Sequence, residues 1–140
     1  MVAAESGQRK PVKQLAVFLV ASDNLSVEQM ASVLGTAADI ALAKGAIREG
    51  AIARIPARQS TWEMREEALS AGEAVGQMLG RLRPLRSQVR ELLDRGCVVK
   101  FSVVQYAGRG TDLSFALDGD DLRLLAEMKA LIDVVHYSEH

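Results

Sequence analysis

The stretch KQLAVFLVAS, from Lys13 to Ser22, restricts the fold of this chain more than any other feature. It is apolar at odd and at even positions, whereas a strand with one face in water alternates apolar and polar residues. The pattern therefore predicts a strand that is covered on both faces, in the interior of a sheet. Its apolar run, from Leu15 to Ala21, is far too short to cross a bilayer.

A short helix is predicted directly after this strand. Ser26 and Gln29 have the spacing of a capping box, in which each side chain satisfies a free backbone N–H at the helix start. Gly35 supplies the left-handed stop that ends many helices. We therefore expect a helix from about residue 26 to residue 34.

A longer helix is predicted in the middle of the chain. Ser70 and Glu73 form a second capping box, and Gly96 ends the apolar periodicity that follows it. Pro84 lies inside this helix and has no backbone N–H to donate. We therefore expect a kink or a break at Pro84.

The only tryptophan of the chain lies in a third patterned segment, STWEMRE. Trp62 and Met64 alternate there with polar residues, which is typical of a half-buried strand. We expect Trp62 to fill the space between the sheet and a helix.

Four more elements are predicted in the last third of the chain. Strands are expected at 97–106 and 112–117, joined as a hairpin by the glycine-containing turn AGRGT. A helix at 118–131 begins with acids, which complement the positive end of a helix dipole. A strand at 132–137 follows it.

The predicted elements indicate one α+β domain at 12–140, preceded by a flexible arm at 1–11. Its sheet would be mainly antiparallel, with four or five strands and with helices on one face. The last six elements would form a ferredoxin-like βαββαβ core, preceded by an extra strand and helix. The segment 36–57 remains open between a short helix, a loop and an irregular strand, and Pro56 favours an edge position for any strand there.

The overall charge and the single cysteine exclude several classes of protein. A net charge of −1 over 140 residues gives no general reason to bind nucleic acid or an anionic membrane. Cys97 is the only cysteine, so neither an internal disulfide nor a cysteine zinc site can form. No secretory signal is evident at the start, and the cytoplasm is the expected location.

Two groups of charges are candidates for docking a partner. Arg83, Arg86 and Arg90 lie close together without an intervening acid, whereas the chain after Thr111 is mainly acidic. These arginines would form one side of a docking surface, and two aspartates would form the other: Asp118 and Asp121. Without such a partner, the arginines are a solvated helix face and the aspartates cap a helix.

Other candidates for chemistry are weaker. A pocket near Trp62 could use Arg65 and Arg109, but Trp62 shares its face with Met64 and is expected in the core. His136 and the two residues nearest the C-terminus are not expected to hold a metal, because nothing in the sequence fixes their geometry. Nothing brings Cys97 to His136 as a nucleophile and its base, so a buried structural thiol is favoured.

The order and spacing of several segments resemble those of a known family. They are LSVEQMASVLG followed by KG, then STWEM, then LGRLRPLRSQVRELLDRG, and finally LSFALDGDDLRLLAEMKALIDVVHY. They resemble the bacterial domain of unknown function 4279 family over residues 12 to 137. Alanines at 37 and 38 stand where the family pattern has a turn with proline. The family has no established activity or catalytic residues that the resemblance could assign to this chain.

Together these observations favour a non-catalytic module that binds an unidentified protein, with an immunity protein as one form of it. An exposed strand edge would also allow a homodimer. The alternative is a domain that binds a small molecule or nucleotide in a cleft near Trp62. No cofactor, metal, membrane or nucleic-acid partner is expected.

Overall fold

The structure is a computed structural model that describes residues 12–47 and 56–138. Its elements, in chain order, are β1 (Gln14–Ser22), α2 (Val27–Leu34), β2 (Ile40–Leu42), β3 (Ser60–Ala68), α3 (Ala71–Leu82), the 3-10 helix η1 (Arg83–Leu85), α4 (Arg86–Asp94), β4 (Val98–Tyr106), α5 (Gly119–Glu127) and β5 (Leu131–Tyr137). None of the helices in these residues has the length and apolar content that crossing a membrane requires. The arm predicted at 1–11 lies outside the described residues.

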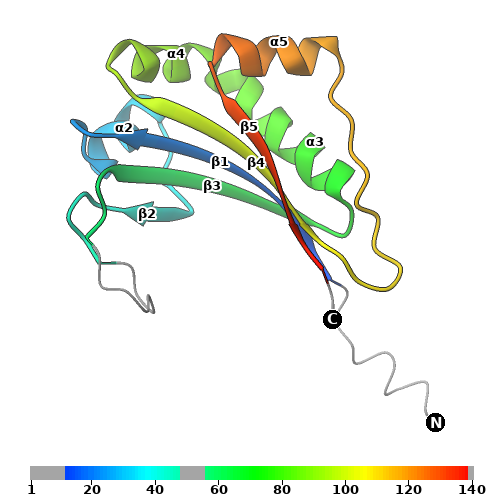
Figure 1. The fold of residues 1–140 in the computed structure, drawn as a ribbon. Coiled ribbons are helices and arrows are strands. Elements are labelled where there is room, and N and C mark those ends of the chain that lie inside the picture. Colours follow the sequence, from blue (N-terminus) through cyan, green and yellow to red (C-terminus); the bar gives the residue numbers. More distant parts are fainter. Residues whose placement is uncertain (1–11, 48–55, 139–140) are drawn as a thin grey trace.

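The five strands form one sheet in the order β2-β3-β1-β4-β5. β1 pairs antiparallel with β3 and β4, and β2 pairs antiparallel with β3, whereas β4 and β5 run parallel. Figure 1 shows α3, α4 and α5 on one side of this sheet, and α2 packs against α4. The predicted α+β class is confirmed, and the sheet is mixed rather than purely antiparallel.

The central position predicted for β1 is confirmed. Phe18, in the middle of β1, lies opposite Met64 of β3 and Phe101 of β4, and all three side chains are buried. Ala16 and Val20 are buried on the same face of β1, which faces the helices. The cover predicted on both faces is only partial, because α3, α4 and α5 lie on one side of the sheet and two leucines of β1 that point to the other side are only half-buried.

Trp62 is a core residue, as its alternation with polar neighbours predicts. Its side chain is completely buried, and its indole Nε1–H donates a hydrogen bond to the carbonyl oxygen of Thr36 at 3.2 Å. The buried ring therefore has a partner for its single polar atom. This contact ties the segment after α2 to β3.

The predicted break at Pro84 is confirmed. α3 ends at Leu82, a 3-10 turn follows, and α4 begins at Arg86. The predicted capping box at Ser26 and Gln29 is also present. The capping box predicted at Ser70 and Glu73 forms only in part: Ser70 accepts a hydrogen bond from the Glu73 N–H at 3.1 Å, without the return bond from the Glu73 side chain.

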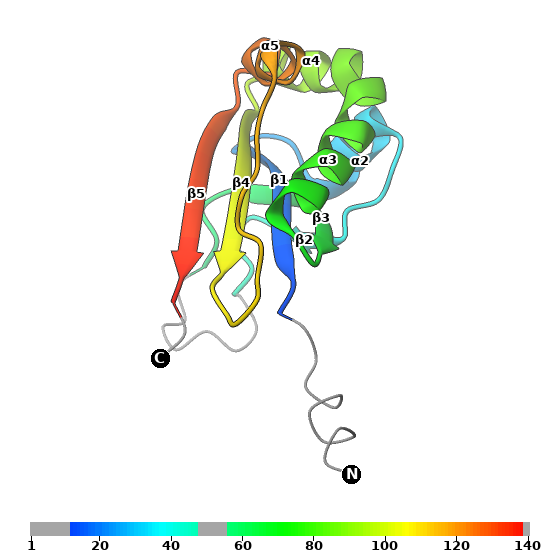
Figure 2. The same cartoon turned by 90° about the vertical axis from the view of Figure 1, so that its right-hand side faces the viewer.

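The hairpin predicted between 97–106 and 112–117 is wrong, because 112–117 forms no strand. After β4 the chain turns and passes back along the sheet to the start of α5 (Figure 2). A strand parallel to β4 requires such a return, so β5 takes the neighbouring position that the hairpin would have filled. The ferredoxin-like βαββαβ order needs the missing strand and is not confirmed.

The segment left open at 36–57 contains the short edge strand β2, which pairs with β3. Beyond it, Ile47 and Pro56 form an isolated antiparallel bridge. The residues between them, 48–55, lie outside the described part of the chain.

We predict that Trp62→Ala lowers the free energy of unfolding by about 3–5 kcal/mol, because it leaves a large cavity between sheet and helices. Urea denaturation followed by circular dichroism measures this change. Thr61→Ala, on the opposite face of β3 and only half-buried, is the matched control and should cost less than about 1 kcal/mol. Native fluorescence typical of a fully solvated tryptophan would contradict the burial.

Candidate interaction surface

One arginine and one aspartate predicted to lie on opposite sides of a docking surface contact each other. Arg83 Nη2 forms a salt bridge with Asp121 Oδ1, and Arg86 Nε lies 3.0 Å from Glu127 Oε2. Asp118 caps α5 by accepting from the Asp121 N–H at 2.8 Å. These contacts link η1 and α4 to α5, so most of the predicted docking charges are satisfied within the chain.

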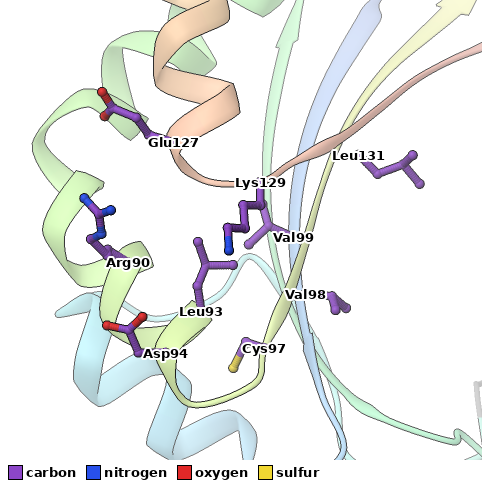
Figure 3. Close-up of a pocket in the computed structure, with 9 residues that line it drawn as sticks. All are labelled: Arg90, Leu93, Asp94, Cys97, Val98, Val99, Glu127, Lys129 and Leu131. Atoms are coloured by element: carbon purple, nitrogen blue, oxygen red, sulfur yellow. The ribbon is translucent and has the colours of Figure 1, made fainter.

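Arg90 lines a hollow of about 390 Å³ between the C-terminal ends of α4 and α5 and the start of β4. Figure 3 shows its charged side chains, which are Arg90, Asp94, Glu127 and Lys129. Leu93 and Val99 supply apolar wall. Lys129 has a φ of 51°, in the left-handed region that costs a side chain energy. The hollow offers both signs of charge to a polar group but no activated nucleophile.

Cys97 also lines this hollow. The side chain is buried, and burial raises the pKa of the thiol above its ordinary value of 9.0. The predicted structural role of Cys97 agrees with this burial. His136 lies opposite Gln105, toward the far end of β4, so the two residues are not brought together as nucleophile and base.

Within residues 12–47 and 56–138, no group of three or more histidine, cysteine, aspartate or glutamate side chains could hold a metal ion. The two terminal residues considered with His136, Glu139 and His140, lie outside this part.

The residues of the alternative pocket are not brought together either. Trp62 is buried among the helices, whereas Arg65 lies on the other face of β3, where its Nε is 2.6 Å from Glu63 Oε2. Along the sheet, Trp62 is level with Val20 and hence with the start of β4. Arg109 follows the opposite end of β4, so a cleft shared by these three residues does not form.

β5 carries the clearest surface feature of the described chain. It is an edge strand, and four of its large apolar side chains are exposed: Leu131 (64%), Ile132 (37%), Val134 (50%) and Tyr137 (54%). No other element has as many exposed large apolar residues. The sheet's other edge is the three-residue strand β2. An exposed apolar edge of this length is a site where another chain can pair.

The direction of the backbone groups of β5 follows from one hydrogen bond. The Ala107 N–H donates to the Tyr137 carbonyl oxygen at 2.8 Å, so that carbonyl points toward β4 and its continuation. Backbone groups alternate in direction along a strand, so those of Ile132, Val134 and His136 point outward. A partner strand would therefore find donors and acceptors at these three residues.

The sequence predicted a strand at 132–137 but did not single out these side chains. The signal was present, because IDVVHY contains neither proline nor lysine, which commonly protect strand edges. Its edge position was not visible, because it depends on which strand lies beside β4.

Comparison with known proteins identifies the family. The family model described as Domain of unknown function (DUF4279) matches residues 10–139. The chain belongs to this family. No curated protein and no solved structure matches it. The family resemblance inferred from the sequence is confirmed over nearly the whole chain.

Asp133 of β5 links the stability of the edge strand to pH. The Ser102 hydroxyl and the Lys100 ammonium hold the pKa of Asp133 below its ordinary value of 3.8. Lys100 Nζ lies 3.1 Å from Asp133 Oδ2. A lowered pKa means that these contacts stabilise the fold fully above pH 3.8 and that the stabilisation is lost as pH falls through the lower folded value.

We therefore predict that the melting temperature of wild type exceeds that of Asp133→Asn at neutral pH and that the difference shrinks below pH 3.8. Melting curves between about pH 6 and about pH 2 measure this difference. Asp94→Asn, at the exposed end of α4, serves as a carboxylate control. A difference that stays constant over the whole range would contradict the pKa direction.

We also predict that Cys97 reacts with iodoacetamide at least about tenfold more slowly in the folded chain than in urea, since the buried thiol stays protonated. Mass spectrometry after timed quenching gives the rate, because the chain has one cysteine. Equal rates with and without urea would show an accessible, reactive thiol.

Proposed function

We propose that this chain is a non-catalytic protein-binding module whose contact element is β5. The observation that carries the proposal is the exposed apolar edge formed by Ile132 and Val134 with Leu131 and Tyr137. Proteins that recognise extended segments often add a strand to such an edge. The outward backbone groups supply affinity, and the side chains on both faces of β5 select the partner.

The ion pairs of η1 and α4 favour β5 as the contact surface over the surface formed by Arg83, Arg86 and Arg90. Arg83 and Arg86 already contact Asp121 and Glu127, so a partner that used them would first have to break these pairs. Of the predicted arginines, Arg90 is the one that lines the hollow, which Leu131 of β5 also lines.

The non-catalytic part of the proposal rests on the distribution of reactive groups. Burial raises the pKa of the Cys97 thiol, so the thiol stays neutral. His136 lies beside Gln105, near the end of β4 that is far from Cys97. A nucleophile needs a base within hydrogen-bonding reach and a third group to orient that base. We place the module in the bacterial cytoplasm, where a free cysteine remains reduced, and an immunity protein is one form that it could take.

Affinity capture with matched variants tests the proposed function. We expect wild type to retain a specific protein partner from a native host lysate and Val134→Lys to lose it, because lysine on an edge strand blocks pairing. Leu122→Lys is the control, because Leu122 is similarly exposed (48%) but lies on α5. Circular dichroism must show that both variants are folded.

Three results would contradict the proposal. If the Arg90→Glu variant loses the partner and the Val134→Lys variant keeps it, the partner binds the surface of Arg83, Arg86 and Arg90 and not β5. Nucleic acid that co-purifies and elutes steeply with salt would indicate a different class of binder. Saturable thermal stabilisation by a metabolite or nucleotide, without a protein partner, would favour the small-molecule alternative.

A further inference from the structure

We propose that a second copy of this chain pairs with β5, so that the two β5 strands run antiparallel about a two-fold axis at Val134. This inference rests on the proposed function and names the partner of β5. It joins the two sheets into one continuous sheet across the dimer. Closed two-fold dimers are the commonest soluble oligomers, and they require a surface that is complementary to itself.

The outward backbone groups of β5 allow this pairing. In an antiparallel pair, residues that point their N–H and C=O groups at the partner lie opposite one another and exchange two hydrogen bonds. The outward residues are Ile132, Val134 and His136, as the Tyr137 carbonyl direction requires. With the axis at Val134, that residue faces its own copy and Ile132 faces His136 of the copy. Every outward group of β5 then has a partner.

The charge of Asp133 excludes one of the other symmetric registers. An axis at Asp133 would place its carboxylate directly opposite the same carboxylate of the copy, which destabilises a strand pair. A parallel, in-register pair would also bring the two carboxylates side by side. An axis at Val134 places Asp133 opposite Val135 of the copy. Asp133 also keeps its own partner, Lys100, at 3.1 Å.

The exposed apolar side chains of β5 gain contacts on both faces in this register. Ile132 and Val134 lie level with Phe101 and Val103 and point to the helix side. The two Val134 side chains would meet at the axis, so their exposed surface would leave water.

On the other face, Leu131 would lie opposite Tyr137 of the copy. The position of the Tyr137 ring is already fixed, because the ring stacks on Tyr106 with centroids 5.1 Å apart. Aromatic–aliphatic pairs across strands stabilise a sheet. The pairing thus covers the apolar residues that set β5 apart from the other elements.

The other edge of the sheet is not suited to the same pairing. β2 has only three residues, Ile40–Leu42, and so few backbone groups cannot form a long ladder. Pairing through β5 leaves that edge free, so the assembly closes as a dimer and does not continue into a fibre.

Sedimentation velocity of the purified chain tests the inference, with a dimer expected for wild type and for Leu122→Lys. Val134→Lys places two ammonium groups at the axis, where like charges cost several kcal/mol, so the dimer should dissociate about a hundredfold more readily or worse. A wild-type chain that stays monomeric at about 100 µM, a concentration at which even weak specific pairs associate, overturns the inference. So does a dimer that Val134→Lys leaves intact.

A second measurement does not depend on the fold of the lysine variant. In a Cys97→Ala background, Val134→Cys should form an intermolecular disulfide on mild oxidation, whereas Leu122→Cys should not. Directly opposed residues have Cα atoms about 5.5 Å apart, within the range that a disulfide spans. Absence of the Val134→Cys cross-link in a chain that sediments as a dimer overturns the register and the two-fold axis at Val134.

The two proposals fail in different ways. A monomeric chain whose Val134→Lys variant loses a heterologous partner retains the proposed function and rejects the self-pairing. A monomeric chain whose variants capture the same proteins as wild type rejects both.

Discussion

The pairing of β1 with both β3 and β4 is the constraint on which the rest of this structure depends. Each of these strands has nine residues, and β1 hydrogen-bonds to one on each side. Phe18 therefore lies between Met64 and Phe101, and these three side chains form part of the sheet face against which the helices pack. Without the central strand, neither the buried Trp62 nor the position of β5 would follow.

The central position of β1 leaves β2 and β5 as the edges, and the two edges differ in chemistry. β2 is short and offers few groups for pairing, whereas β5 is long and exposes apolar side chains on both faces. A protein that stays monomeric usually shields such a strand with charge, proline or a covering loop. This difference between the two edges is the observation on which the proposed association through β5 rests.

The break at Pro84 explains why arginines that the sequence predicts to be free for a partner form salt bridges within the chain. Because a 3-10 turn separates α3 from α4, Arg83 of this turn reaches Asp121, and Arg86, the first residue of α4, reaches Glu127. Arg83 and Asp121 are 38 residues apart in the chain, so neither residue reveals the pair by its local pattern. Arg90, about one turn further along α4, lines the hollow that Leu131 of β5 also lines.

The sequence by itself determined the features that depend on neighbouring residues: the central strand 13–22, the caps at Ser26, Ser70 and Asp118, the break at Pro84 and the burial of Trp62. These signals are local, because a cap or a strand face involves residues a few positions apart. Only the tertiary structure decided that 112–117 is no strand, that β5 runs parallel to β4, and that β5 is an exposed edge. Strand direction and edge position depend on which distant segment occupies the next place in the sheet, and hydrophobic alternation is the same in either direction.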